Sequence, residues 1–239
     1  MIPKIIHYCW FGGKAKPKLA KKCIASWKKF CPDWEIIEWN ETNFDTSAHP
    51  YAAFCHKTQK WAFLSDFVRL AVVSDHGGIY LDTDVELIRS PKNLLKEEAF
   101  LGYENDQFIN TGLGFGAEAG HPTVRAMLER YLALTPDENG AFPLIACPRL
   151  NTQALETLGL TPDGTEQTVA GARILPTDRL NPYEYTTGRM LKTENTLSIH
   201  WYNQSWISPA AQFRSKLTKP FHRLFGTDCF RWMKKNEKD

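Results

Sequence analysis

The sequence lacks the features that mark membrane-spanning and zinc-binding proteins. No stretch approaches the ~20 consecutive apolar residues needed to cross a bilayer, and no signal-peptide pattern precedes the first predicted strand. The six cysteines form no CxxC pair, and several lie in apolar runs where a free thiol behaves as a small hydrophobe (Cys9, Cys23, Cys31, Cys55, Cys147 and Cys229). We therefore expect a cytoplasmic protein in a reducing setting, without a zinc site.

A strong net charge is also missing, which argues against a nucleic-acid-binding protein. The formal charge is +2, but the cations are unevenly placed. Seven lysines and no acid lie between Lys14 and Lys29, and eight Lys or Arg face three acids between Phe213 and Asp239. With 239 residues, 43% of them hydrophobic and 23% charged, the chain fits one packed domain with a small terminal appendage.

The first forty residues predict a βαβ unit of a parallel sheet. Residues 2–8 are short, apolar and β-branched, as expected of a buried strand that runs into a glycine turn. Pro17 opens a helix with apolar residues at helical spacing, Pro32 ends it, and residues 34–39 form the next strand. This order favours a nucleotide-binding α/β fold.

Two aspartates follow a short strand in the middle of the chain. Residues 51–75 predict one amphipathic helix, which a glycine pair ends, and residues 79–81 predict the strand after it. Asp82 and Asp84 come directly after this strand. They are thus expected at the carboxyl end of a central strand, where open α/β sheets bind their ligands.

The other elements follow from the same periodicity and turn signals. We expect strands at residues 85–88, 99–103, 113–117 and 196–200, a strand or pair of strands at 167–175, helices at 122–134 and 151–158, and a loop rich in Pro and Gly at 135–149. No internal repeat or low-complexity tract interrupts this series.

The aspartate pair points to a divalent cation. Two carboxylates one residue apart on a sharp turn can aim oxygens into one cleft, and hard oxygen ligands suit Mg²⁺ or Mn²⁺. A diphosphate would supply further oxygens, and the cation would offset charge that develops on a leaving nucleoside diphosphate. A bare DxD occurs by chance on many surfaces, so the prediction rests on the buried strand and the glycine-ended helix that precede Asp82 and Asp84.

Asp66 and Arg69 lie three residues apart in the helix predicted at 51–75 and therefore share a face. This spacing is typical of a partly buried ion pair. With the aspartate pair close by, a second interpretation is that Asp66 accepts hydrogen bonds from sugar hydroxyls while Arg69 holds an oxygen of the sugar or phosphate with its planar fork. Both interpretations stay open at this point.

Four segments of the chain together resemble one family of glycosyltransferases. They read IIHYCWFGG, WAFLSDFVRLAVVSDHGGIYLDTDVELIRSP, FINTGLGFGAEAGHP and HWYNQSW. The combination resembles the glycosyltransferases with a DxD sugar-binding region, which include bacterial capsular polysaccharide transferases and fungal initiating mannosyltransferases. It is also similar to the core of the large clostridial glucosylating toxins. The resemblance runs from Ile2 to about Trp206.

The resemblance implies a GT-A type fold, a Rossmann-like mixed sheet flanked by helices, and a retaining transfer from a nucleotide sugar. Within it, Trp10 matches the aromatic residue that stacks on the nucleotide base. Asp66 and Arg69 match the pair that grips the donor sugar. Asp82 and Asp84 match the acids that contact the ribose and bind the metal.

The later part of the chain matches the family more loosely. Asn110 lies where the family places polar contacts near the sugar. His200, Ser205 and Trp206 match a segment that closes near the metal and diphosphate, and we expect His200 to be a further metal or phosphate ligand. The glycines after Asn110 do not link a strand to a helix, so they predict no phosphate-cradling loop.

His7 and Trp10 can also be interpreted from their positions in and just after the first predicted strand. Trp10 follows a buried strand and precedes two glycines, where it could stack on a base or lie in the core, and position alone does not decide between these. His7 lies on the strand itself and is expected to be a core histidine with satisfied hydrogen bonds.

The sequence therefore predicts a metal-dependent, retaining glycosyltransferase that moves a hexose or N-acetylhexosamine from a nucleotide sugar. A UDP-sugar is the favoured donor and GDP-mannose is the alternative, and the acceptor would be a glycan or lipid-linked oligosaccharide in bacterial capsule or surface polysaccharide synthesis. Three alternatives stay open: a Mg²⁺-dependent phosphohydrolase, a toxin-like protein glycosyltransferase and a non-catalytic carbohydrate-binding module.

The predicted domain boundary separates a catalytic domain at residues 1–208 from a basic tail at residues 209–239. The tail predicts an amphipathic helix, with Phe and Leu on one face, Lys and Arg on the other, and Pro220 interrupting it. Such a helix could lie on an anionic membrane, on the inner face of the cell membrane, or dock its apolar face onto the catalytic domain.

Overall fold

The computed structural model describes residues 1–203, 209–226 and 229 of the chain. The strands are β1 (Ile5–Cys9), β2 (Glu35–Trp39), β3 (Gly78–Tyr80), β4 (Val85–Leu87), β5 (Ala99–Asn105), β6 (Phe108–Ile109), β7 (Phe115–Ala117), β8 (Gln167–Val169), β9 (Ala172–Leu175), β10 (Tyr183–Glu184), β11 (Arg189–Met190) and β12 (Ser198–His200). The helices are α1 (Lys18–Phe30), α2 (Pro50–Lys57), α3 (Trp61–His76), α4 (Pro122–Leu132), α5 (Cys147–Glu156), α6 (Thr177–Leu180) and α7 (Pro209–Phe225), with short 3₁₀ turns η1 (Lys92–Lys96) and η2 (Thr111–Leu113).

One mixed sheet organises the chain, in the order β2-β1-β3-β7-β5-β9-β8 with β6 beside β5. β1 runs parallel to β2 and β3, whereas β7 is antiparallel to both of its neighbours. β3 and β5, which flank β7, therefore point the same way and end at the same edge. The predicted βαβ unit and the α/β class with a mixed sheet flanked by helices are confirmed.

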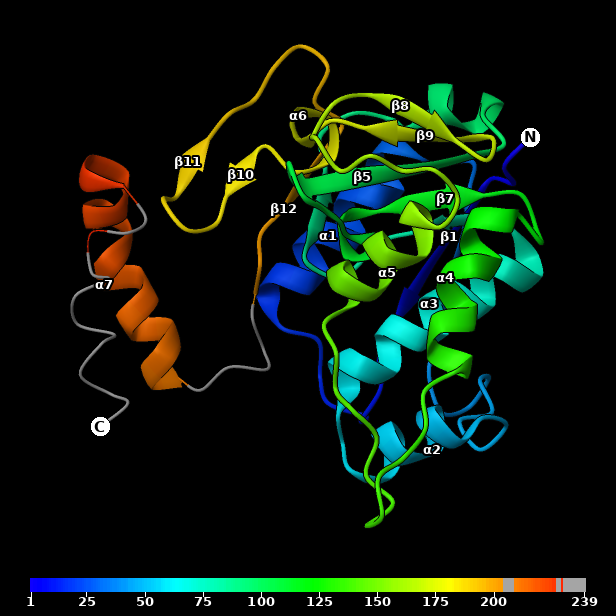
Figure 1. Cartoon of the computed structure of the whole chain (residues 1–239). Coiled ribbons are helices and arrows are strands. Elements are labelled where there is room, and N and C mark those ends of the chain that lie inside the picture. Colours follow the sequence, from blue (N-terminus) through cyan, green and yellow to red (C-terminus); the bar gives the residue numbers. More distant parts are fainter. Residues whose placement is uncertain (204–208, 227–228, 230–239) are drawn as a thin grey trace.

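Helices cover both faces of the sheet (Figure 1). Alternate residues of β1 divide between the two cores: Ile6 and Tyr8 pack with Trp27 of α1, while Cys9 packs with the residues of α3, α4 and α5. Trp27 is fully buried, and its indole N–H donates to the Val85 carbonyl at 2.8 Å, which ties α1 to β4. The alternation of side chains along a strand thus places one helical layer on each face.

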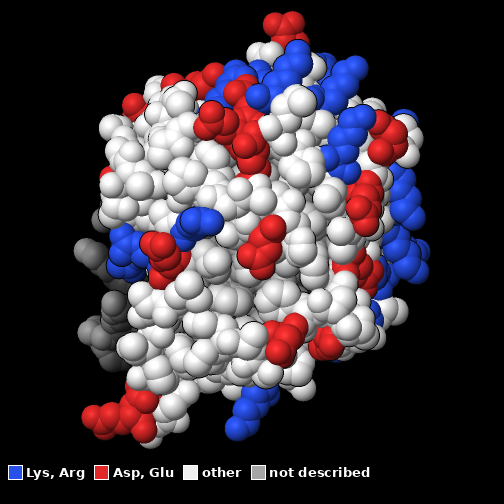
Figure 2. Space-filling view, turned by 90° about the vertical axis from the view of Figure 1, so that its right-hand side faces the viewer, with Lys and Arg blue, Asp and Glu red and all other residues white. Residues whose placement is uncertain are grey.

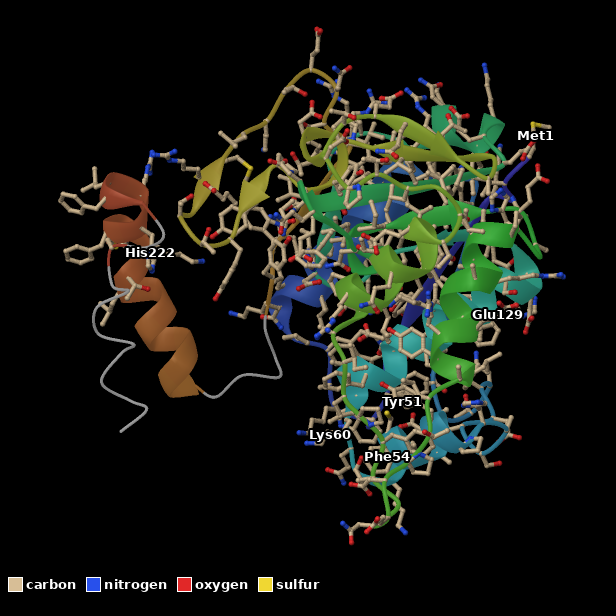
Figure 3. All side chains as sticks on the ribbon, in the orientation of Figure 1. Met1, Tyr51, Phe54, Lys60, Glu129 and His222 are labelled. Carbon is tan, nitrogen blue, oxygen red and sulfur yellow. The ribbon has the colours of Figure 1, made fainter. Side chains whose placement is uncertain are left out.

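The segment predicted as one helix at 51–75 is two helices, so that prediction is wrong in detail. α2 ends at Lys57, and Gln59 adopts a left-handed backbone conformation with φ of 56° before α3 begins at Trp61. The Thr58 hydroxyl donates to the Phe54 carbonyl at 2.7 Å, a local bond that ends the helix with its own side chain. Because of this turn, α2 packs against α3. Figure 3 labels Tyr51 and Phe54 of α2.

Two proline positions also differ from expectation. The loop predicted to reach residue 149 ends earlier, because Pro148 lies in the first turn of α5, where a proline is tolerated. Pro220 does not interrupt the tail helix but lies inside α7. The hairpin β10–β11 and α6 were not predicted, since their short segments carry little periodicity, whereas the pair β8–β9 at 167–175 is confirmed.

α7 stands apart from the sheet, beside the hairpin β10–β11 (Figure 1). The predicted boundary at residue 208 falls in the segment 204–208, outside the described residues. No described helix has both the length and the apolar character that a bilayer crossing requires. All six cysteines carry free thiols.

His7 is a buried core residue, as predicted. Its Nδ1 accepts from the Trp39 indole N–H at 3.0 Å, so its Nε2 carries the proton and donates to the Gly77 carbonyl at 2.8 Å. Burial lowers the pKa of His7 to about 4, because the charged form is poorly solvated there.

We expect acid to destabilise the fold through His7. Between about pH 6.5 and about pH 4 the unfolded chain binds a proton at this histidine and the folded chain does not, so the free energy of unfolding falls as pH drops, by roughly 2 kcal/mol at pH 5. Urea unfolding of wild type and His7→Gln at pH 7 and pH 5 measures this, with a smaller loss expected in the variant. An equal loss in both proteins would contradict it.

Candidate active site

A cleft of about 600 Å³ lies at the carboxyl ends of β1, β3 and β5. Seven of the nine predicted site residues line it: Trp10, Asp66, Arg69, Asp82, Asp84, Asn110 and His200. The other two, Ser205 and Trp206, lie outside the described residues. The cleft therefore collects residues that are as much as 190 positions apart in sequence, because β1, β3 and β5 end at one edge and the pairing of β12 with β4 brings His200 to it.

A sharp turn after β3 places the two aspartates. α3 ends at Gly77, whose φ of 65° lies in the left-handed region, and the chain turns straight into β3. After the strand, the Val85 amide donates to the Asp82 carbonyl at 2.9 Å and closes a tight turn. Both carboxylates line the cleft as a result, as the sequence predicted.

Arg69 joins the predicted helix pair to the first aspartate. Its Nη2 lies 3.0 Å from an oxygen of Asp66 and 3.0 Å from an oxygen of Asp82, and the Tyr80 hydroxyl donates to Asp82 at 2.9 Å. The guanidinium also lies over the Tyr80 ring, 5.0 Å from its centroid. The ion-pair interpretation of Asp66 and Arg69 is therefore confirmed, and the pair extends to the DxD segment.

The buried position of this network changes the acidity of its members. Burial raises the pKa of Asp66 to about 6 and raises that of Asp82 above its usual value, although the charge of Arg69 opposes both shifts. Two carboxylates share one guanidinium, so the fully ionised network carries one net negative charge. A cation placed beside Asp82 would neutralise it.

β12 brings a histidine to the second aspartate. β12 pairs antiparallel with β4, with His200 opposite Val85, and His200 Nε2 lies 3.1 Å from Asp84 Oδ1. The Asn203 amide donates to Asp84 Oδ2 at 2.7 Å. Burial alone would raise the pKa of Asp84, but the charge and hydrogen bond of His200 outweigh it and lower this pKa to about 2. Asp84 is therefore an ionised carboxylate.

Asp82, Asp84 and His200 fit a divalent cation. One ligand atom from each of them lies within 4.8 Å of the others, and within the described part of the chain the buried Nδ1 of His200 has no hydrogen-bond partner. Two carboxylates suit Mg²⁺ and Mn²⁺, and the cleft leaves room for phosphate oxygens. The three residues together could hold the ion that the sequence predicted, with His200 as the third ligand.

The loop that carries Asn110 meets Asp82 at Gly112. The Asn110 side chain accepts from the Gly112 amide at 2.6 Å and donates to Glu104 at 3.1 Å. A Cβ on Gly112 would lie 2.5 Å from Asp82 Oδ2, and that oxygen cannot give way freely because Arg69 holds its carboxylate. Glycine is required here to let the Asn110 loop approach the aspartate.

Sequence reasoning missed three residues of the cleft. Glu104 lies at the carboxyl end of β5, and the rule that placed Asp82 at the end of β3 could have found it. Cys147 begins α5 in a segment read as a loop, where it accepts from Arg69 Nη1 at 3.6 Å and donates to Asn110 at 3.5 Å. Tyr202 follows β12, and its ring is tilted against that of His200 with centroids 4.1 Å apart; no local pattern indicates it.

Trp10 lies at the mouth of the cleft and is only partly buried. Its indole N–H donates to the Lys14 carbonyl at 2.6 Å, and the Lys16 ammonium lies 5.6 Å from its ring. The wall position favours the ligand-facing interpretation over the core one. Stacking on a nucleotide base stays a prediction.

Comparison with known proteins assigns the segment that carries these acids. Residues 17–101 match the sequence model of a family described as "Glycosyltransferase sugar-binding region containing DXD motif". These residues are thus similar to the sugar-binding region of that family. Asp66, Arg69, Asp82 and Asp84 all lie inside it, and the family resemblance read from the sequence is confirmed.

A curated relative shares the sugar-binding region. "Inositol phosphoceramide mannosyltransferase 3" of Schizosaccharomyces pombe is 30% identical over 128 residues, which are 51% of this chain and 35% of the relative. The chain thus spans about a third of the length of that relative. The likeness supports the glycosyltransferase assignment of the region without transferring the relative's own substrates.

Two solved glycosyltransferase structures align with the chain at low similarity. PaToxG glycosyltransferase aligns with a TM-score of 0.48 and 20% identity over 65% of this chain and 69% of its own. A glycosyltransferase involved in the glycosylation of the major capsid of PBCV-1 aligns with a TM-score of 0.48 and 14% identity over 90% of this chain and 100% of its own. At these scores the assignment rests on the matched region and the site geometry.

We expect Gly112→Ala to weaken binding of Mn²⁺ with a nucleoside diphosphate by about tenfold or more, because the new methyl group displaces the Asp82 carboxylate. Isothermal titration with Mn²⁺ and UDP or GDP measures this. Gly102→Ala is the matched control: its methyl group would meet the flexible end of Leu180 at 2.8 Å, so stability should fall while affinity is kept. Equal affinities in Gly112→Ala and wild type would contradict the prediction.

Proposed function

We propose that this protein is a metal-dependent glycosyltransferase that moves a hexose or N-acetylhexosamine from a nucleotide sugar to a hydroxyl group. One observation carries the proposal: Asp82, Asp84 and His200 converge in the same cleft as the Asp66–Arg69 pair, within a DXD sugar-binding region. The cleft is lined by these residues and by the partly buried Trp10. It is therefore suited to a diphosphate and its base.

The carboxylates would bind different parts of the donor complex. Asp84 and Asp82, with His200, would hold Mn²⁺ or Mg²⁺, and Mn²⁺ is favoured because Mg²⁺ prefers oxygen ligands alone. When bound, the cation offsets the charge that develops on the departing nucleoside diphosphate. Asp66 lines the cleft and would accept hydrogen bonds from sugar hydroxyls.

We propose that Arg69 acts through its ion pairs, which is one of the two interpretations that the sequence left open. Its Nη2 contacts Asp66 and Asp82 and its Nη1 donates to Cys147, so both terminal nitrogens are engaged, while its buried Nε has no hydrogen-bond partner among the described residues. In this arrangement Arg69 positions two carboxylates rather than gripping the donor. Preorganised charges of this kind stabilise a transition state without reorganising during the reaction.

We propose that the transfer retains the configuration of the donor sugar. The acceptor hydroxyl would attack the face that the phosphate leaves, and the leaving phosphate would take its proton, so no side-chain nucleophile is needed. Of the four acids that line the cleft, Asp66 and Asp82 are tied to Arg69 and Asp84 to His200. Glu104 is the fourth acid among the described residues; it accepts from the Asn110 side chain at 3.1 Å, and we propose that it contacts the acceptor.

The stereochemical proposal is tested by the product. We expect the anomeric coupling constant in the proton NMR spectrum of the product to show the same configuration as in the donor. An inverted product would contradict retention and would assign Glu104 as the catalytic base, because an inverting transfer needs a carboxylate to deprotonate the acceptor.

The donor is proposed to be a UDP-sugar, with GDP-mannose as the alternative that the mannosyltransferase relative favours. The acceptor is proposed to be a glycan or lipid-linked oligosaccharide of bacterial capsule or surface polysaccharide. We place the protein in the cytoplasm, at the inner face of the cell membrane. These assignments follow the family resemblance and the basic regions of the sequence.

We expect Asp82→Asn and Asp84→Asn each to abolish Mn²⁺-dependent hydrolysis and transfer from the preferred donor, since each removes a charged ligand. A panel of UDP- and GDP-sugars with and without Mn²⁺, read by thermal shift and by release of UDP or GDP, identifies that donor. Asp75→Asn, an exposed aspartate of α3, is the control and should behave as wild type.

Other outcomes of the same panel would replace the proposal. Turnover of simple phosphate esters in place of nucleotide sugars would indicate a phosphohydrolase. Sugar binding without any turnover would indicate a carbohydrate-binding module. Transfer to a protein in place of a glycan would indicate a toxin-like enzyme.

A further inference from the structure

α7 exposes large apolar side chains on one face. Leu217, Leu224 and Phe225 are 57%, 75% and 71% exposed, and their spacing along the helix puts them on one side. In Figure 3, His222 marks α7 on the opposite side of the molecule from Met1 and Glu129. Contiguous exposed apolar side chains of this size mark a surface that meets a partner or a lipid.

Among the described residues, Lys219 and Arg223 attach α7 to the hairpin β10–β11. The Lys219 ammonium donates to the Tyr183 hydroxyl at 3.0 Å and lies 4.4 Å from the Tyr185 ring centroid. The Arg189 guanidinium donates to the Arg223 carbonyl at 2.8 Å. Leu217, Leu224 and Phe225, three described side chains of the apolar face, thus stay exposed, which argues against the alternative that the sequence left open, a helix docked through this face onto the catalytic domain.

α1 presents a basic face. Lys18, Lys21, Lys28 and Lys29 are exposed at helical spacing, while the opposite face buries Cys23 and Trp27. Within the described part of the chain, no ion pair engages these four lysines. On the side of the molecule drawn in Figure 2, Lys and Arg gather mainly along the top and right-hand edge and leave most of the face without positive charge.

A chain of contacts connects α1 to α7. Lys22 of α1 lies 5.3 Å from the Trp201 ring centroid, and the rings of Trp201 and Tyr183 are 5.7 Å apart. Tyr183 in turn receives the hydrogen bond of Lys219 from α7. Figure 1 shows α1, β12, the hairpin and α7 following one another.

We propose that α1 and α7 form one surface that binds an anionic lipid bilayer. The exposed Leu and Phe of α7 would enter the headgroup region, and the α1 lysines would contact negatively charged headgroups, each contributing about 1 kcal/mol. A lipid bilayer is the partner that offers negative charge and apolar depth together.

The cleft lies close to this surface, so a bilayer bound there could present a lipid-linked acceptor for sugar transfer. Lys14 and Pro17, just before α1, line the cleft on one side, and Tyr185 of the hairpin lines it as well. A bilayer against α1 and α7 would therefore lie beside the cleft entrance. The inference deepens the proposed function, because it names how a lipid-linked acceptor would be presented, but vesicle binding itself needs no catalysis.

Co-flotation of the full chain with vesicles tests the proposal. We expect binding to vesicles of phosphatidylcholine and phosphatidylglycerol, weak binding to phosphatidylcholine alone, and weaker binding at high salt. Leu224→Ser with Phe225→Ser, and Lys21→Glu with Lys28→Glu, should each reduce binding by about tenfold or more. Lys92→Glu with Lys96→Glu reverses two exposed charges on η1 and should bind as wild type.

Three results would overturn the proposal: no flotation of wild type with phosphatidylglycerol vesicles, wild-type binding by both the α1 and the α7 variants, or a stable dimer in light scattering that the α7 variant abolishes. Donor hydrolysis measured without vesicles reports on the cleft separately. A failure of membrane binding therefore leaves the catalytic proposal standing, and a failure of catalysis leaves the membrane surface standing.

Discussion

The guanidinium of Arg69 is the constraint on which the candidate site depends. It holds Asp66 and Asp82 at 3.0 Å each, so it fixes α3 against the end of β3 and keeps two acids together in a buried place. Removing the guanidinium would leave two buried carboxylates without a compensating charge, which typically costs several kcal/mol of folding free energy. The network still carries a net negative charge, and that charge makes the cleft receptive to a divalent cation.

β12 and the residues just after it supply the second half of the site. β12 pairs with β4 and not with the main sheet, and this pairing sets His200 against Asp84 and carries Trp201 toward α1. The same segment leads on to α7. The candidate metal ligand His200 and the proposed lipid-binding helix α7 are thus close in sequence, and we expect a change in the packing of β12 to affect both.

Local signals account for what the sequence could predict. The βαβ unit, the aspartates at the end of β3 and the Asp66–Arg69 pair follow from periodicity and short spacing. Glu104 lies at the carboxyl end of β5 and could have been found by the same rule as Asp82, whereas Cys147 could not, because only the packing of α5 brings it to the cleft. His200 was reached through family resemblance, since no local pattern joins residues 84 and 200.

The central claim is that Asp82, Asp84 and His200 hold a divalent cation against a nucleotide diphosphate. Crystals grown with Mn²⁺ and UDP, measured at the manganese absorption edge, test it directly. We expect one anomalous peak at bonding distance from Asp82, Asp84 and His200 and from phosphate oxygens. A peak elsewhere, or bound nucleotide with no manganese beside these residues, would contradict it.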